Sequence, residues 1–114
     1  MGFDLGGTKL ASGVVSVDGK VIATKRELVD FKNGPDGFLK FLEDNARYWL
    51  AKYPKIQSLG IASCGPLDGK SGVLLQPTNF PKWGNIKVAS YLQSRLKLKV
   101  SMQNDAAAVA GAEG

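Results

Sequence analysis

The stretch Asp4-Leu5-Gly6-Gly7-Thr8-Lys9 joins two apolar runs near the start of the chain, and the expected fold is built outward from it. Adjacent glycines let the backbone approach a ligand closely. Successive backbone N–H groups can then hold an anion, to which the Thr8 hydroxyl and the Lys9 ammonium would add. Asp4 would hold a metal-bound water beside that anion. The stretch is equally typical of an ordinary hairpin with Gly-Gly at its tip, so on its own it leaves a phosphate turn and a hairpin open.

The length and composition of the chain are those of one soluble globular domain. It has 114 residues, of which 44% are hydrophobic and 22% charged, enough for a real core. No apolar run approaches the ~20 residues of a membrane span, and the N-terminus lacks the pattern of a signal peptide. The one cysteine, Cys64, excludes an intrachain disulfide and a Cys-rich metal site. We therefore expect a cytoplasmic protein with no membrane partner.

The polar residues exclude further classes of function. The chain has no histidine, so acid–base chemistry must come from carboxylates or lysines and not from a Ser-His-Asp arrangement within it. The net charge is +5, but the Lys and Arg residues are scattered. In the densest run of basic residues, 95–99, the Arg and Lys side chains alternate with leucines, which is typical of a solvated strand face. We expect no nucleic-acid partner for this segment.

Three short strands joined by tight turns are predicted at the start of the chain. They span residues 2–5, 10–17 and 20–28. Asp18-Gly19, between the second and the third, is a strong hairpin signal. The three strands are expected to form an antiparallel meander.

A helix and a buried strand follow the meander. Asn33-Gly34-Pro35-Asp36 is a helix-start signal, and apolar residues at a helical period predict a helix over residues 35–52. Trp49 is expected in the core rather than in a ligand site. Residues 56–63 are almost continuously apolar, which suits a strand buried on both faces. Because a helix crosses over before it, this strand should run parallel to the first.

The second half of the chain completes the expected fold. In order, we predict a loop at 64–69, a short strand at 72–75, an irregular stretch at 76–85, a helix at 86–96, a strand at 98–102 and an alanine-rich helix at 106–113. The fold class is α/β: a mixed five-stranded sheet, made of a three-strand antiparallel meander plus two parallel strands, with helices on both faces.

Polar loops leave the carboxyl ends of the parallel strands, where ligands bind in an open α/β sheet. They are residues 4–9, residues 63–68 and Asn104-Asp105. Asp105 is the best acid–base candidate, because a helix N-terminus favours the ionised carboxylate that a base needs. Asp is also a preferred helix N-cap, so position alone leaves both roles open. Asn104 can fill the cap role instead.

Two other features of these loops have simple interpretations. Cys64 is either a reactive thiol or a small buried or loop residue, and the second is favoured. Asp68-Gly69 is typical of turn chemistry.

Four motifs of the chain together resemble the ROK family of bacterial sugar kinases and related sugar-responsive repressors. They occur in the family's order and span nearly the whole chain: Asp4-x-Gly6-Gly7-Thr8-Lys9, the run from Gly60 to Asp68, Pro77-Thr78-Asn79-Phe80-Pro81-x-Trp83, and Asn104-Asp105-Ala106. The resemblance implies the actin-like ATPase fold, which is ribonuclease H-like. It also implies an ATP-dependent kinase that uses Mg²⁺ and a hexose substrate.

The resemblance implies roles for individual residues. The nucleotide phosphates would contact Asp4, Gly6, Gly7, Thr8 and Lys9, with Mg²⁺ near Asp4 through water. The sugar would contact Gly65, Pro66, Asn79, Asn104 and Asp105. Asp105 would take the proton from the hydroxyl that is phosphorylated, and a placed base contributes on the order of a hundred- to ten-thousand-fold to the rate.

The chain departs from the family in two residues and in length. Cys64 stands where many members have proline and Ala107 where many have a polar residue, which leaves the sugar open. The family has a second domain with the adenosine site, further sugar ligands and usually a structural zinc site. We therefore expect residues 1–114 to be the N-terminal lobe of a two-lobe kinase, without the C-terminal lobe. The intact protein is expected to be a homodimer, and this segment alone to be inactive.

Two other functions compete with the kinase. One is the effector-binding lobe of a sugar-responsive repressor, whose members carry a helix-turn-helix ahead of the first strand. Only Met1, Gly2 and Phe3 precede Asp4 here, which favours the kinase. The full phosphate turn and Asp105 favour the kinase as well, because a pure sensor needs neither of them. The other competing function is an α/β domain with no catalysis.

Overall fold

The computed structural model describes residues 1–6, 9–16, 18–29, 31–63, 67–68, 72–75 and 83–104, with the backbone alone at residues 67, 68 and 104. The described residues form strands and two helices in the order β1 (Gly2–Leu5), β2 (Lys9–Val15), β3 (Val21–Leu28), α1 (Gly34–Lys52), β4 (Ser58–Ser63), β5 (Leu67–Asp68), β6 (Val73–Leu74), α2 (Val88–Leu96) and β7 (Lys99–Asn104).

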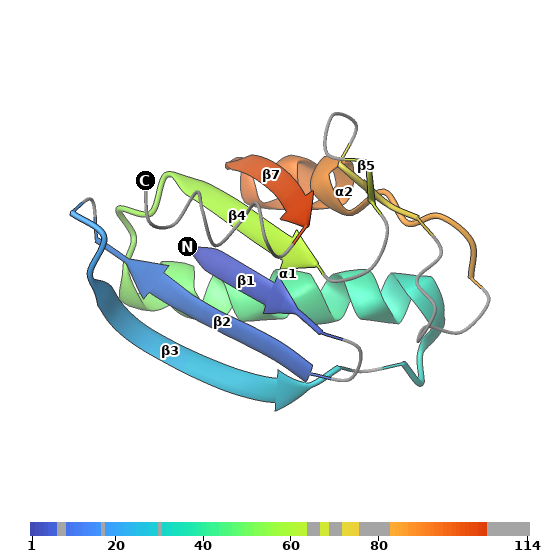
Figure 1. Cartoon of the computed structure of the whole chain (residues 1–114), viewed down its shortest axis with the longest axis horizontal. Helices are drawn as coiled ribbons and strands as arrows, with labels where there is room; N and C mark the ends of the chain where they lie inside the picture. The colour runs from blue at the N-terminus through green and yellow to red at the C-terminus, as the bar shows by residue number, and fades with distance from the viewer. Residues whose placement is uncertain are drawn as a thin grey trace.

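Five of the strands form one mixed sheet in the order β3-β2-β1-β4-β7 (Figure 1). β1, β2 and β3 pair antiparallel, whereas β4 runs parallel to β1 and β7 parallel to β4. The hairpin between β2 and β3 turns at Gly19, which has a φ of +89°. Its N–H donates to the Ser16 carbonyl at 2.9 Å. The predicted meander and the two added parallel strands are confirmed.

The core lies between this sheet and the two described helices, which pack on the same face of it (Figure 1). Apolar side chains recur along α1 at the predicted helical spacing, and Phe38, Leu42 and Ala46 are fully buried. Trp49 is buried as well, and its indole N–H donates to the Ser12 hydroxyl at 3.0 Å. The prediction that Trp49 belongs to the core is therefore correct. Neither described helix is long and apolar enough to cross a membrane.

A polar contact joins α1 to α2 beside this core. The buried Glu43 carboxylate accepts hydrogen bonds from Arg47 Nε at 2.8 Å and from the Tyr91 hydroxyl at 2.8 Å. Burial raises the pKa of Glu43, but the hydrogen bonds from Arg47 and Tyr91, with the positive charges of Arg47 and Arg95, outweigh it and lower the pKa. The ionised carboxylate therefore holds the two helices together.

Three predicted elements differ from those in the structure. Leu67 and Asp68, expected within a loop, form β5 and pair with β6. The second helix begins at Val88, because Ile86 instead forms a β-bridge with Leu74, with both N–H···O distances at 2.8 Å. The strand expected to end at residue 102 continues to Asn104.

The remaining predictions fall outside the described residues. They concern Cys64, most of the irregular stretch at 76–85 and the helix at 106–113. The two described helices cover one face of the sheet. The prediction of helices on both faces therefore depends on the segment from 106 to 113.

Candidate functional site

The three parallel strands end side by side. Leu5, the last residue of β1, is in register with Ser63 at the end of β4, and Ser63 is in register with Asn104 at the end of β7. The arrows of β1, β4 and β7 accordingly point the same way in Figure 1. The loops predicted to carry ligand contacts therefore start from one edge of the sheet, as expected.

The first of these connections is a tight turn from β1 to β2. The Gly6 N–H donates to the Lys9 carbonyl at 2.9 Å. A Cβ added to Gly6 would lie 3.4 Å from that same carbonyl oxygen, an ordinary van der Waals contact. Lys9 is exposed at the start of β2. The connection is thus a hairpin, one of the two predicted alternatives. Residues 7 and 8 at its tip lie outside the described residues, so the phosphate turn stays a prediction.

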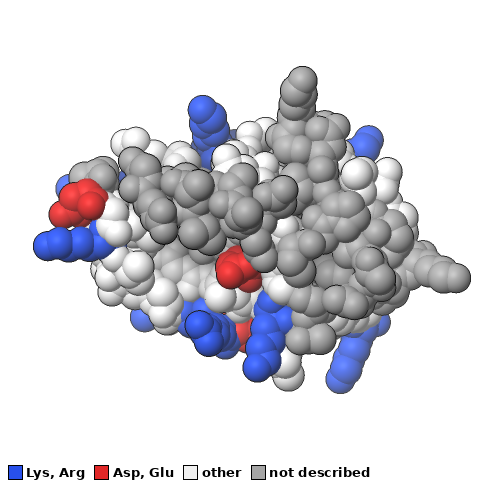
Figure 2. Space-filling view, in the orientation of Figure 1, with Lys and Arg blue, Asp and Glu red and all other residues white. Residues whose placement is uncertain are grey.

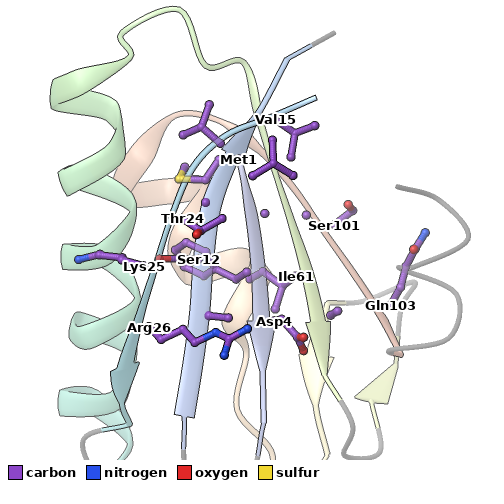
Figure 3. A pocket seen from close by; sticks show the side chains of 18 residues that line it. Met1, Asp4, Ser12, Val15, Thr24, Lys25, Arg26, Ile61, Ser101 and Gln103 are labelled. Atoms are coloured by element: carbon purple, nitrogen blue, oxygen red, sulfur yellow. The ribbon is translucent and has the colours of Figure 1, made fainter. Parts of the chain in front are cut away.

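Asp4 lies on the face of the sheet that neither described helix covers, which we call the second face. Figure 3 shows its carboxylate on this face, and Asp4 is exposed. The register across the strands places Ala11 and Ala62 on either side of Asp4, then Arg26 beyond Ala11 and Gln103 beyond Ala62. Arg26 and Gln103 are thus each two strands, ~10 Å, from Asp4 along the row. The Arg26 side chain extends across β2 in the direction of Asp4 (Figure 3).

A second row of very small residues lies next to the row of Asp4. It consists of Thr24, Gly13, Gly2, Gly60 and Ser101. The two rows line a hollow of about 730 Å³ whose floor is largely backbone (Figure 3). As far as the described residues are concerned, a group that lies against the second face can therefore approach the strands closely, because few of their side chains stand in the way.

The predicted site residues are only partly within the described chain. Asp4, Gly6 and Lys9 are described and lie near the carboxyl edge, and the backbone of Asn104 ends β7 at the same edge. Predictions for Gly7, Thr8, Gly65, Pro66, Asn79 and Asp105 concern residues outside the described set. Their proposed roles stay predictions.

Two residues in the same row as Asp4, each two strands away from it, were missed by reasoning from the sequence. Arg26 and Gln103 share its row, one supplying a positive charge and the other an amide. The alternation of inward and outward residues along each strand was visible in the sequence. The pairing register, which aligns one strand with the next, was not.

The exposed Asp4 carboxylate suits a hydrated magnesium ion. Mg²⁺ keeps several of its waters and takes one or two carboxylates from the protein together with substrate phosphates. Among the described residues no group of three or more His, Cys, Asp or Glu side chains gathers. An exposed carboxylate at the edge where the predicted phosphate turn begins fits that mode of binding, in which the ion is held through water.

The sequence pattern of the ROK family matches residues 1–114. A β-glucoside kinase of Klebsiella pneumoniae is 33% identical over 111 residues, which cover 97% of this chain and 36% of the relative. A glucokinase of Thermotoga maritima is 33% identical over 108 residues, 93% of this chain and 33% of the relative. The chain thus spans about a third of the length of these curated relatives.

Solved structures of sugar kinases share the fold. A ROK family glucokinase from Streptomyces griseus, in complex with glucose and AMPPNP, has a TM-score of 0.79 at 28% identity over 96% of this chain and 34% of its own. A ROK hexokinase from Thermus thermophilus has a TM-score of 0.77 at 27% identity, over 92% of this chain and 34% of its own. The actin-like ATPase fold expected from the sequence is confirmed.

Proposed function

Because the chain belongs to the ROK family, as the match over residues 1–114 shows, we propose that it is the N-terminal lobe of an ATP-dependent hexose kinase. The observation that carries the proposal is the alignment of Leu5, Ser63 and Asn104 at the ends of three parallel strands. It brings the origins of the predicted phosphate turn, sugar loop and Asn104-Asp105 junction to one edge. Transfer of a phosphoryl group from a bound nucleotide to a bound sugar requires that the loops holding the two ligands lie at the same edge.

The nucleotide phosphates would lie against the turn between β1 and β2. The backbone N–H groups of Gly6 and Gly7, the Thr8 hydroxyl and the Lys9 ammonium would contact them. Phosphoryl transfer depends mostly on positioning and on charge stabilisation, which these groups supply. Bound Mg²⁺ would neutralise charge on the transferred group, and Asp4 would hold it through water. The exposed position of Asp4 on the second face supports this assignment.

The sugar would be held by Gly65, Pro66, Asn79 and Asn104, with Asp105 as the base. Asp105 would accept the proton of one sugar hydroxyl, whose oxygen then bonds to the γ-phosphorus of ATP. The bond from that phosphorus to the β–γ bridging oxygen breaks, and ADP leaves with its electron pair. The proton on Asp105 is later released to water. A base in this position contributes on the order of a hundred- to ten-thousand-fold to the rate.

The rest of the active site would lie in a second lobe. We assign to it the adenosine site, the remaining sugar ligands and a structural zinc site, since the chain spans about a third of its curated relatives. The cleft between two lobes must close to exclude water, so this segment alone would catalyse little. The intact protein would be a cytoplasmic homodimer.

The alternative function is the effector-binding lobe of a sugar-responsive repressor. A ROK family transcriptional regulator, a homologue of the E. coli MLC protein, has a TM-score of 0.74 at 19% identity, which is a likeness of fold alone. A repressor needs DNA binding and no phosphoryl transfer. Electrophoretic mobility shifts with the full-length protein, with and without sugar, would separate the two functions.

A coupled ATP assay of the full-length gene product against a panel of hexoses tests the kinase. We expect turnover with at least one hexose and a fall of at least about a hundredfold in kcat for Asp105→Asn. Asp44→Asn on the exposed side of α1 is the matched control and should retain full activity. Absence of turnover with every hexose, or full turnover in Asp105→Asn, would refute the proposal.

A further inference from the structure

Arg26 carries a positive charge on the second face of the sheet, in the row that contains Asp4. Its side chain is exposed. Ion pairs tie up the charges of Lys25, Lys40 and Arg47, whereas none of the described residues forms one with the Arg26 guanidinium. A guanidinium offers five N–H donors in a planar fork, which matches the oxygens of a carboxylate or a phosphate. Within the described chain, Arg26 is therefore a candidate contact for an anionic ligand.

The direction of the Arg26 side chain points to a ligand beside Asp4. Ala11 lies between the two residues in the row, and its small side chain leaves room above β2. The Arg26 side chain extends across β2 toward Asp4, and both residues line the hollow on this face (Figure 3). In Figure 2, basic side chains lie over β2 and β3 next to an acidic side chain over β1. The guanidinium and the carboxylate thus approach one space from opposite sides.

The spacing between Arg26 and Asp4 suits a phosphate group that is bound through magnesium. The strands that carry the two residues are two strand spacings apart, ~10 Å. Mg²⁺ held by Asp4 through water would keep a phosphate several ångström from the carboxylate, because a water molecule lies between. The phosphate would then lie in the interval into which the long Arg26 side chain extends. We propose that the Arg26 guanidinium donates hydrogen bonds to the β-phosphate of the magnesium-bound nucleotide.

The assignment of Arg26 to the β-phosphate rests on the proposed function. In phosphoryl transfer the metal ion bridges β- and γ-phosphate oxygens. A cation at the β-phosphate also stabilises the negative charge that collects on ADP as it leaves. Lys9 lies diagonally from Arg26 on the same face, since its register partner on β3 is Leu28. Two cations therefore approach the phosphates from the side of β2 and β3, and Asp4 approaches from β1.

A charge on an edge strand can also serve only to keep other strands from pairing with that edge. Such a role requires neither a particular direction of the side chain nor a small residue beside it. Lys99 is an exposed charge on β7, which is the other edge strand of the described sheet. It is the first residue of β7 and thus lies at the end of that strand away from the carboxyl edge. Lys99 is therefore the matched control for Arg26.

Calorimetry of nucleotide binding to the full-length protein, with Mg²⁺ and without sugar, tests the contact. Arg26→Gln should weaken the binding of ADP by about 10- to 100-fold, because a hydrogen-bonded contact between charged groups is lost. AMP has no β-phosphate and should bind to the variant and to the wild type equally. Arg26→Lys should be intermediate, because it keeps the charge and loses the planar fork. Lys99→Gln should bind both nucleotides as the wild type does.

Kinetics and urea denaturation of the same variants separate this contact from a structural role. In Arg26→Gln the KM for ATP should rise by a similar factor, whereas the KM for the hexose and the urea midpoint should keep their wild-type values. Wild-type affinity for ADP in Arg26→Gln, or an equal loss of affinity for ADP and AMP, would overturn the proposal. In a protein that phosphorylates no hexose, the comparison of ADP with AMP still decides the contact, so failure of the proposed function is distinguishable.

Discussion

The indole N–H of Trp49 donates a hydrogen bond to the hydroxyl of Ser12 at 3.0 Å, deep in the core between α1 and β2. Ser12→Ala would leave this buried donor without its acceptor, so we expect a loss of about 1–3 kcal/mol in the free energy of unfolding. Urea denaturation followed by Trp fluorescence measures it. Ser101→Ala, on an exposed position of β7, is the matched control and should change stability by less than about 0.5 kcal/mol. Equal losses in both variants would contradict the assigned role.

Acid should weaken the contact between α1 and α2. The folded-state pKa of Glu43 is below its ordinary value of 4.5, because the hydrogen bonds from Arg47 and Tyr91 outweigh the effect of burial. A lowered pKa adds stability that is fully present above the unfolded-state value and is lost as the pH falls through the folded-state value. The free energy of unfolding should therefore fall below about pH 4.5. Glu43→Gln should lose this part of the pH dependence and Tyr91→Phe should reduce it. Parallel curves for Glu43→Gln and the wild type would refute the prediction.

Two glycines of one row should respond differently to a methyl group. A Cβ on Gly13 would lie 2.6 Å from the carbonyl oxygen of Ala23, whereas a Cβ on Gly2 meets nothing within 4 Å. We expect Gly13→Ala to destabilise the protein by about 1–3 kcal/mol through overpacking. Gly2→Ala should change stability by less than about 0.5 kcal/mol. Thermal unfolding of both variants measures these changes. A Gly13→Ala variant as stable as the wild type would contradict the prediction.

Removal of the Asp4 carboxylate should impair the proposed phosphoryl transfer. Asp4→Ala would deprive Mg²⁺ of its protein partner, and loss of one electrostatic contact to a transition state costs ~10²–10³ in kcat. The Mg²⁺ concentration at half-maximal rate should rise as well. Initial rates across a magnesium series test both effects. Asp18→Ala, in the hairpin between β2 and β3, is the control and should follow the wild type. Equal magnesium dependence in Asp4→Ala would remove Asp4 from the site.

Much of the fold could be predicted because its main signals are local. The Asp18-Gly19 hairpin, the apolar period of α1 and the buried run of β4 each depend on neighbours within one element. β5 could not be predicted in this way, since its two residues form a strand only through their pairing with β6.

In the candidate site, too, some features could be predicted from local sequence and others depend on pairing between distant strands. Asp4 and the edge where the predicted loops start followed from motif and topology. The positions of Arg26 and Gln103 in the row of Asp4 depend on the register of β3 and β7. The same holds for the contact between Glu43 and Tyr91 outside the site. These two residues are 48 positions apart in the sequence, and only the packing of α1 on α2 brings them together.

The strand order also has a consequence for the folding pathway. β1, β2 and β3 are neighbours in sequence and in the sheet, so their pairings close short loops and are expected early. β4 follows α1 in the sequence, so its pairing with β1 closes a longer loop and is expected later. This pairing brings the Met1 amino group to the Ser58 carbonyl, 57 residues away, to which it donates a hydrogen bond. The row of Leu5, Ser63 and Asn104 is complete only when β7 joins β4. The edge that would hold the ligands is therefore expected to be the last part of the sheet to assemble.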